Sequence, residues 1–339
     1  MLYLGRPEGP PHDARYHIGN VPGVYISYPF CAQKCTYCNF ASGVFPRDRE
    51  ALYLDALHAE IRAHHWQWQP ETVYLGGGTP SNLAPESLAA LLSELPGRPW
   101  AEATLEAAPG NITADLARSW AAAGIDNINI DLIAGLSGQT EFSFRESLDW
   151  IDRLAPEHVS VYMLEVDEDS RLGKDMLLGG TRYGAMDTPS DDAIAGFYEI
   201  AVDRLAAMGI TRYEISNFAR PGRESRHNLK YWLLEPYIGF GADAHSFDDA
   251  IRSQNGESLE DYLAGRGRAT SPRDLGEHLF VGLRLTNGVR PDPAEWRRFD
   301  QPIRRFLDAG LLETDGVLLR LTGRGVLLSN EIFQEFLVP

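Results

Sequence analysis

Three cysteines, the only ones in the 339-residue chain, fall within one short stretch. They are Cys31, Cys35 and Cys38, in the order Cys-Ala-Gln-Lys-Cys-Thr-Tyr-Cys. An odd, clustered set is poor material for a disulfide framework. Thiolates at this spacing can instead wrap around one face of a cubane iron–sulfur cluster. Three ligands leave one iron open to a small chelating molecule, so the spacing predicts a [4Fe–4S] cluster with an open iron.

Two other interpretations of the cysteines stay open at this point. A three-cysteine zinc site would need a fourth ligand nearby, and no histidine lies between His17 and His58. Three buried thiols without a metal are the plainer alternative, because cysteine is often buried. Their place in a polar loop argues against that alternative.

A glycine run and two carboxylates are the next candidates for chemistry. Gly76, Gly77 and Gly78 precede Thr79 and Pro80, and glycines let a backbone come close to a ligand. A tight turn between a strand and a helix is the plainer interpretation of this run. Glu106 lies at the end of one expected strand and Asp131 lies in another. A surface carboxylate at a strand end is the plainer interpretation of Glu106.

Alternating short apolar runs and helical patterns must position these groups. The pattern predicts βα units and an α/β fold with a parallel sheet or barrel. In such folds the chemistry lies at the carboxyl ends of the strands, where the cysteines, the glycine run and Glu106 fall. The expected strands are Val24–Ser27, Thr72–Leu75, Ala103–Ala107, Asn127–Ile133, His158–Leu164 and Tyr213–Asn217. The expected helices lie near 49–66, 83–95, 113–123, 141–154 and 190–208.

Two later parts of the chain depart from the alternation of strands and helices. Residues 168–192 read as an irregular segment, which in a compact domain is usually functional or mobile. From Pro291 onwards an apolar helical run at Phe299–Leu307, a strand pair around Gly316 and a last helix around 324–337 predict a winged-helix-like domain. Six arginines against eight acidic residues there favour a packing or lid role over DNA binding. We therefore expect three parts, at 1–225, 226–290 and 291–339.

Composition narrows the function classes. Hydrophobic residues make up 44% and charged residues 23% of the chain, as in ordinary globular proteins. The formal net charge of −17 disfavours nucleic-acid partners, because an acidic surface repels phosphate backbones. No stretch approaches the roughly 20 apolar residues that span a bilayer. The first twenty residues do not read as a secretory signal, so we expect a cytoplasmic protein.

The cysteine loop resembles the signature of the radical S-adenosylmethionine (SAM) superfamily, CxxxCxxC with an aromatic residue, here Tyr37, before the last cysteine. The resemblance implies a partial (β/α) barrel, a [4Fe–4S] cluster on the three cysteines, and SAM chelated by the open iron. Relatives carry His and Ile where this chain has Ser27 and Tyr28. By resemblance, the residues expected to contact SAM are Tyr25, Tyr37, Gly77, Gly78, Thr79, Glu106 and Asp131.

A second motif, His-Asn-Leu-Lys-Tyr-Trp at 227–232, resembles HNxxYW of the HemW-like haem-chaperone branch of the oxygen-independent coproporphyrinogen III oxidase family. The resemblance associates His227, Asn228, Tyr231 and Trp232 with haem. It implies haem and haem-accepting proteins such as respiratory enzymes as partners. Phe40 stands where the oxidising branch has a fourth cysteine, which favours the chaperone. An oxygen-independent coproporphyrinogen III dehydrogenase, which decarboxylates propionates by a radical route in porphyrin biosynthesis, is the alternative.

Two histidines are candidates for ligation of haem iron, and the other seven are not. Imidazole is a common axial ligand of haem iron, and His245 is a second candidate beside His227. The plainer alternative has His227 and Asn228 hydrogen-bonded at a domain junction while the aromatic residues pack in the core. The remaining histidines form no constellation and are expected on the surface or on helices: His12, His17, His58, His64, His65, His158 and His278.

One departure from the family concerns the residues around Gly124. In relatives, a strand, a helix and a second Ala-Gly pair come between the Ala-Gly pair that ends here at Gly124 and the strand that begins here at Asn127. About one βα unit is therefore absent, and the flanking strands should pair directly. The absent segment carries the Gln and Arg that relatives use on SAM, and no position here inherits those roles. A degenerate cluster-binding protein without SAM turnover is thus a further alternative.

Overall fold

The computed structural model describes residues 21–107 and 112–337. Their main sheet has the strand order β11-β10-β9-β8-β1-β2-β3-β4-β5-β7-β6, and neighbouring strands from β8 to β5 run parallel. The five strands that follow one another along the chain at its centre are β1 (Gly23–Tyr28), β2 (Thr72–Gly77), β3 (Glu102–Ala107), β4 (Asn127–Ala134) and β5 (His158–Met163). The expected partial barrel with a parallel sheet is confirmed.

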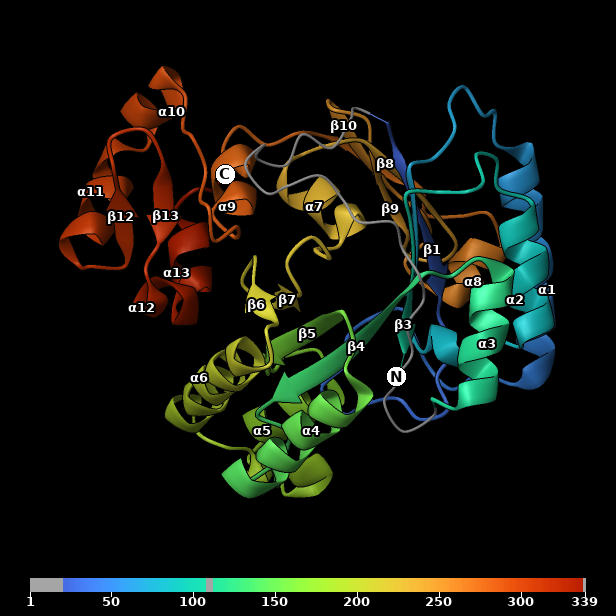
Figure 1. The fold of residues 1–339 in the computed structure, drawn as a ribbon, viewed down its shortest axis with the longest axis horizontal. Coiled ribbons are helices and arrows are strands. Elements are labelled where there is room, and N and C mark those ends of the chain that lie inside the picture. The colour runs from blue at the N-terminus through green and yellow to red at the C-terminus, as the bar shows by residue number, and fades with distance from the viewer. Residues whose placement is uncertain (1–20, 108–111, 338–339) are drawn as a thin grey trace.

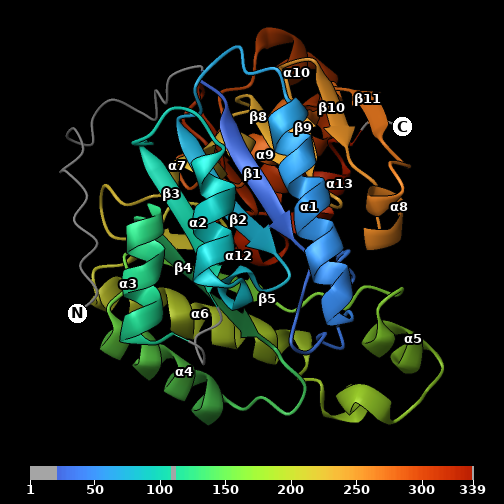
Figure 2. The same ribbon diagram turned by 90° about the vertical axis from the view of Figure 1, so that its right-hand side faces the viewer.

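Helices cover the outer face of this curved sheet, while α7 (Arg226–Trp232) lies on its inner face (Figure 1). Figure 2 shows α1, α2 and α3 side by side in front of β1, β2 and β3. The covering helices are α1 (Arg47–Ala63), α2 (Pro85–Ser93), α3 (Ala114–Ala123), α4 (Glu141–Leu154) and α6 (Asp191–Ala207). Each lies within a few residues of its expected range. Thr113, Thr140 and Ser190 cap the amino ends of α3, α4 and α6.

In the described part of the chain, two buried apolar clusters fill the space between the central sheet and these helices. One joins β1–β3 to α1–α3 around Leu57 and Trp120. The other joins β4 and β5 to α4 and α6 around Leu148. The partly buried side chains that pack against both clusters are Ile112 and Ile128. The core is therefore divided at the joint between β3 and β4.

The β3–β4 joint is where the sequence predicts an absent βα unit. The two strands pair directly and in parallel there, from Thr104 opposite Asn127 to Ala107 opposite Ile130. The expected direct pairing of the flanking strands is confirmed. Loss of a whole βα unit leaves strand direction unchanged, so the sheet stays continuous.

The secondary structure differs from the prediction in two segments. The strand expected at Tyr213–Asn217 is instead the hairpin of β6 (Thr211–Arg212) and β7 (Asn217–Ala219), which lies antiparallel to β5. A tight turn interrupts the apolar run. The Tyr213 amide donates to the Asn217 carbonyl (3.1 Å), and the buried Glu214 carboxylate accepts from the Ser216 amide (2.7 Å).

The segment expected to be irregular, 168–192, contains α5 (Arg171–Leu177) and a 3₁₀ segment, η3 (Arg182–Asp187). Ser170 caps α5 by accepting from the Gly173 amide (2.9 Å), and Leu172 is fully buried. A helix cap and one buried side chain stabilise this short helix, although the sequence shows no amphipathic pattern there.

The sequence did not predict the strands that follow residue 236. These strands, β8 (Tyr237–Phe240), β9 (His245–Phe247), β10 (Ile251–Gln254) and β11 (Ala269–Pro272), extend the main sheet beyond β1. Between them and before the last domain lie α8 (Leu259–Leu263) and α9 (Glu277–Gly282). The division of the chain at residues 225 and 290 stays a prediction.

The last part of the described chain has the expected winged-helix-like order of elements. The strands β12 (Leu312–Thr314) and β13 (Leu319–Leu321) form a hairpin across Gly316. The helices are α10 (Pro293–Arg298), α11 (Asp300–Asp308), α12 (Gly323–Leu327) and α13 (Ser329–Gln334). Figure 1 shows this part beside the barrel, next to α9. No helix in the ranges that the structure describes is long and apolar enough to cross a membrane.

Candidate cofactor site

The cysteine loop leaves the carboxyl end of β1 and is tied to the glycine run. The Cys31 amide donates to the Gly43 carbonyl (2.8 Å), which closes the base of the loop. The Gly78 amide donates to the Tyr28 carbonyl (2.8 Å), and the Thr79 amide donates to the Phe30 carbonyl (3.0 Å). The structure therefore brings the two predicted motifs together at the carboxyl edge of the parallel strands.

The three thiols are free and reachable from solvent. Cys35 is exposed, while Cys31 and Cys38 are partly exposed. Burial and a hydrogen bond with Cys35 raise the pKa of Tyr37, which belongs to the same loop. Within the described residues, no three His, Cys, Asp or Glu side chains are placed to hold a single metal ion. A cubane cluster, whose ligands bind different irons, is the group for which three thiolates on one loop provide the donor set.

The segment around α5 holds the cysteine loop from the other side. The Asn39 side chain donates to Asp167 (2.6 Å), and the Leu172 amide donates to the Thr36 carbonyl (2.9 Å). The Arg171 guanidinium donates to the Cys35 carbonyl (3.4 Å). No pattern in the sequence indicates this role for residues 167–172, because backbone acceptors and tertiary contacts define it.

The close packing of neighbouring atoms requires glycine at positions 76 and 78. A Cβ atom on Gly78 would lie 2.8 Å from the Pro29 carbonyl carbon, and one on Gly76 would lie 3.0 Å from the Glu106 carboxylate. Gly77 has a φ of +110°, which disfavours other residues. The run therefore makes a tight strand-to-helix turn and also leaves the Gly77 amide pointing at Glu106 Oε2 (3.3 Å).

Glu106 and Asp131 form a pair of carboxylates on the inner face of the sheet. Burial, and next the charge of Asp131, raise the pKa of Glu106 to about 8, although hydrogen bonds from Tyr74 and Gly77 act in the other direction. Burial raises the pKa of Asp131 to about 6, against hydrogen bonds from Ser160 and Asn129. Two such carboxylates favour a cationic ligand, because a positive charge offsets their desolvation.

The strand register explains why so many polar groups face this site. Residues two apart on a strand share a face, and the pairing places Tyr74 beside Tyr25, Glu106 beside Asn129 and Asp131 beside Ser160. Parallel strands are usually apolar on both faces, so this polar inner face is unusual. Its alternating members are Thr72, Tyr74, Glu102, Thr104, Glu106, Asn127, Asn129, Asp131, His158, Ser160 and Tyr162.

His158 belongs to this inner face, and its expected place on the surface or a helix was wrong. It begins β5, is fully buried, and its ring contacts Asn129 Oδ1 and the Tyr213 hydroxyl, each at 2.8 Å. Ser160 donates to Asn217 (2.7 Å) in the same network. A polar residue at every second position of a buried strand was the signal that could have revealed these residues. His12 and His17 lie outside the described residues.

The helix α7 (Arg226–Trp232) carries the HNxxYW residues onto the amino half of the inner face. His227 is fully buried, and both ring nitrogens are engaged: Nδ1 with the Thr72 hydroxyl and Nε2 with the Tyr231 hydroxyl, each at 2.8 Å. Burial lowers the pKa of His227 to about 3, so the ring is neutral. The Tyr74 ring stacks on His227, with 5.3 Å between ring centroids.

A buried carboxylate fixes the start of α7. Glu102 on β3 accepts from the Ser225 hydroxyl (2.8 Å) and from the amides of Arg226 (2.8 Å) and His227 (3.2 Å). Negative charge at a helix amino end satisfies free N–H groups there. The sequence did not predict Glu102, since only the fold brings it to residue 225.

The other candidate haem residues differ in accessibility. Asn228 is buried, and its backbone amide donates to the Ser225 hydroxyl (3.3 Å). The Arg284 guanidinium lies 4.3 Å from the Trp232 ring centroid. The Trp232 Nε1 atom is buried and has no hydrogen-bond partner among the described residues. His245 is exposed at the start of β9.

Comparison with known proteins agrees with this geometry. The model of the radical SAM superfamily matches residues 25–154. The chain is 31% identical to the heme chaperone HemW of Bacillus subtilis (strain 168), over 92% of this chain and 98% of the relative. It is 32% identical to the heme chaperone HemW of Mycobacterium tuberculosis (strain ATCC 25618 / H37Rv), over 93% and 94%. The fold resembles coproporphyrinogen III oxidase (HemN) from Escherichia coli, with a TM-score of 0.75, 20% identity, and coverage of 93% and 90%.

The same comparison bears on the absent βα unit. The alignment with the Bacillus subtilis protein runs over 382 positions, which is more than the 339 residues of the whole chain. The relative therefore has segments that this chain lacks, and their place between α3 and β4 stays a prediction. The identity over nearly the full length of both proteins is nonetheless decisive, and this chain belongs to the heme chaperone HemW family within the radical SAM superfamily.

Proposed function

We propose that this chain is a haem chaperone, which carries a [4Fe–4S] cluster and delivers haem to haem proteins. The observation that carries this proposal is the 31–32% identity with heme chaperones over more than nine-tenths of the chain. Haem is the cargo, and haem-accepting proteins such as respiratory enzymes are the proposed recipients. The cytoplasm is the proposed location. Nucleic acid is not a proposed partner of so acidic a chain.

The proposed cluster ligands are Cys31, Cys35 and Cys38. The loop that carries them is closed by its own backbone hydrogen bonds and held by α5, so the thiols project from a supported scaffold. The cluster would supply one-electron chemistry when bound. The chain's part is to fix the three thiolates and to leave one side of the loop open.

The proposed SAM contacts line the carboxyl edge of the strands. The support is the carboxylate pair of Glu106 and Asp131, which suits the positive sulfonium and ammonium groups of SAM. Tyr74 and Gly77 orient Glu106 by donating to its two oxygens. The full proposed set is Tyr25, Tyr37, Gly77, Gly78, Thr79, Glu106 and Asp131.

The proposed haem-associated residues are His227, Asn228, Tyr231 and Trp232 on α7. In this conformation His227 has no free nitrogen, so ligation of haem iron by His227 requires the loss of one of its two hydrogen bonds. The hydrogen bond between His227 and the Tyr231 hydroxyl is the one proposed to break, because Tyr231 is partly exposed whereas Thr72 is fully buried. His245, which is exposed, is the second candidate ligand.

A cluster-binding protein without SAM turnover is the second candidate function. The observation that favours it is the direct β3–β4 pairing, together with alignments longer than the chain. The segment absent at this joint is the one expected to carry two SAM contacts. A coproporphyrinogen III dehydrogenase is disfavoured by Phe40, which is exposed where a fourth cysteine would stand.

One series of measurements tests these proposals. The full chain is reconstituted anaerobically with iron and sulfide, and the reduced protein is examined by EPR with and without SAM. A [4Fe–4S]⁺ signal that SAM perturbs is expected for the chaperone with an intact SAM site, and a signal indifferent to SAM supports the second candidate. Loss of the signal in Cys35→Ser, but not in the control Ser93→Ala on the exposed end of α2, locates the cluster. Haem titration of the same preparation must show saturable binding, and its absence would contradict the chaperone function.

A further inference from the structure

A row of hydrogen bonds on the inner face of the sheet ends at one of the two carboxylates. The hydroxyl of Tyr213, in the turn between β6 and β7, lies 2.8 Å from His158 Nε2. His158 Nδ1 lies 2.8 Å from Asn129 Oδ1, and Asn129 Nδ2 donates to Asp131 Oδ1 (2.7 Å). Tyr213, His158 and Asn129 are buried. A buried row of this kind therefore holds Asp131, a proposed SAM contact, from the side away from solvent.

The donors and acceptors of this row can be assigned. Asn129 Oδ1 only accepts, so His158 Nδ1 carries a proton and donates it. A hydrogen bond from the Asn228 side chain on α7 acts on the Tyr213 hydroxyl, and burial, the larger effect, raises the pKa of Tyr213. The phenol therefore keeps its proton and donates it to His158 Nε2. Every bond thus points the same way, towards Asp131.

The Asn129 side-chain amide has two possible orientations, and His158 selects one of them. In the observed orientation its NH₂ group faces Asp131 and the Ser160 hydroxyl (2.8 Å). If the amide were turned over, its oxygen would face the Asp131 carboxylate, and two acceptors would meet without a proton between them. Ser160 does not enforce the choice, because a hydroxyl both donates and accepts. The Nδ1–H group of His158 does enforce it, because that group needs an acceptor.

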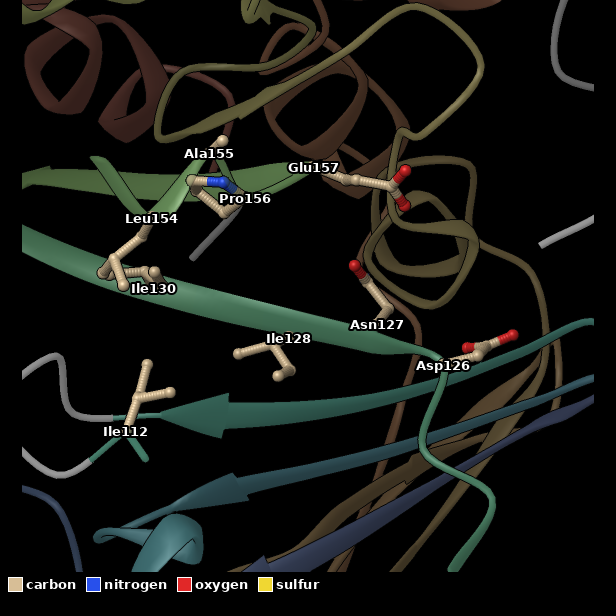
Figure 3. A pocket seen from close by; sticks show the side chains of 9 residues that line it. All are labelled: Ile112, Asp126, Asn127, Ile128, Ile130, Leu154, Ala155, Pro156 and Glu157. Carbon is tan, nitrogen blue, oxygen red and sulfur yellow. The ribbon is translucent and has the colours of Figure 1, made fainter. Parts of the chain in front are cut away.

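The other face of β4 is apolar and takes no part in this row. Residues two apart on a strand share a face, so Asn129 and Asp131 lie on one face, and Ile128 and Ile130 lie on the other. Figure 3 shows these two isoleucines lining a pocket together with Leu154 of α4. The hydrogen-bonded row is therefore confined to the face that carries the proposed SAM contacts.

We propose that His158 is a positioning residue of the SAM site, which holds Asn129 so that the amide stabilises Asp131 in its ionised form. This inference rests on the proposed binding of SAM beside Glu106 and Asp131. Burial raises the pKa of Asp131 to about 6, and the hydrogen bonds from Ser160 and Asn129 act in the other direction. Loss of the Asn129 contact should therefore raise that pKa further. A cationic ligand then binds more weakly at the pH values where Asp131 titrates.

Among the described residues, four titratable side chains interact with the charge of Asp131. Three are tyrosines: Tyr74 of β2, Tyr162 of β5 and Tyr37 of the cysteine loop. Burial raises the pKa of each, so they stay neutral. The fourth is Glu106 of β3, whose pKa burial and the charge of Asp131 raise to about 8, so it is mostly protonated at pH 6. Between pH 5 and 7, Asp131 is therefore the member of this set whose charge changes most.

The test is calorimetric titration of the cluster-reconstituted full chain with SAM at pH 6 and at pH 8. His158→Phe keeps a ring that cannot donate. It is expected to weaken SAM binding about fivefold at pH 6 and less than about twofold at pH 8, as a rise of about one unit in the pKa of Asp131 requires. His158→Asn keeps a donor close to the position of Nδ1 and should restore most of the affinity at pH 6. Tyr213→Phe frees the His158 tautomer and should give a smaller loss of the same kind. Tyr198→Phe is the matched control, because it removes a buried hydroxyl that donates to the Ile215 carbonyl instead, and it should leave both affinities unchanged.

Each outcome decides the proposal. A loss at pH 6 that largely disappears at pH 8, and that His158→Asn reverses, supports it. An equal loss at both pH values would show a general packing defect and overturns it. Unchanged SAM binding in His158→Phe also overturns it, while the SAM site itself stands. A wild type that binds no SAM at either pH refutes the SAM site, and this proposal with it. If His158→Phe does not fold, the same comparison of pH 6 with pH 8 in Tyr213→Phe decides.

Discussion

The Thr72 hydroxyl and the His227 ring lie 2.8 Å apart (Oγ1 to Nδ1), although 155 residues separate them in the sequence. Thr72 begins β2, and His227 lies in the first turn of α7. The contact fastens the HNxxYW helix to the inner face of the sheet and holds His227 in one orientation. The histidine is therefore both part of the fold and the first candidate for haem ligation.

Replacing Thr72 with valine should destabilise the chain. The substitution keeps the shape and leaves His227 Nδ1 buried without a partner, which costs about 1–3 kcal/mol. The free energy of unfolding from denaturant titration measures the loss. Thr211→Val, at an exposed position of β6, is the control and should change it by less than about 0.5 kcal/mol. Equal effects of the two substitutions would show that the Thr72 contact contributes nothing specific.

Replacing Tyr231 with phenylalanine should strengthen haem ligation by His227. The variant removes the partner of Nε2 and leaves the ring otherwise packed, so the nitrogen becomes available to iron. We expect a severalfold lower haem dissociation constant and a Soret band shifted towards that of histidine-ligated haem. The double variant Tyr231→Phe/His227→Phe should lose both changes. If the spectrum of Tyr231→Phe matches the wild type, His227 is not the ligand, and His245→Ala becomes the next variant to titrate.

The carboxylate pair should make stability fall as the pH rises. The folded-state pKa of Glu106 is about 8, above its ordinary value, so the protonated form is favoured in the fold. This contribution is complete below pH 4 and is lost as the pH rises through about 8. Glu106→Gln should flatten that loss and raise the free energy of unfolding at pH 8.5 by roughly 1–3 kcal/mol. Unfolding titrations of the cluster-free chain between pH 5 and 9 measure both curves. An equal slope in the two proteins would refute the raised pKa.

SAM should bind more tightly at higher pH, because a cationic ligand favours the ionised pair. The Tyr74 hydroxyl donates to Glu106 (2.9 Å) and lowers its pKa. Tyr74→Phe should therefore shift the pH profile of SAM affinity upward by about half to one unit. Calorimetry at several pH values measures the profile. Tyr262→Phe, which removes a hydroxyl bonded to Glu60 on the other side of β1, is the control and should leave it unchanged.

The sequence by itself determined the features that depend on local pattern. Three cysteines at fixed spacing identify a loop whose chemistry needs no distant residue. The periodicity of apolar residues located the strands β1 to β5 and the helices α1, α2, α3, α4 and α6. The helix α5 lacks that periodicity. The absence of a unit near Gly124 could also be predicted without coordinates, because the resemblance to relatives implies which motifs should follow one another along the chain.

Only the tertiary structure decided how distant segments share hydrogen bonds. Glu102 caps a helix that begins 124 residues later, and His158 joins a buried network with Asn129 and Tyr213. Such pairings depend on strand register and on which chain segment returns to the inner face, and neither leaves a periodic signal. The same reason explains α5 and the strands β8–β11, which are short and are ordered mainly by contacts with the barrel.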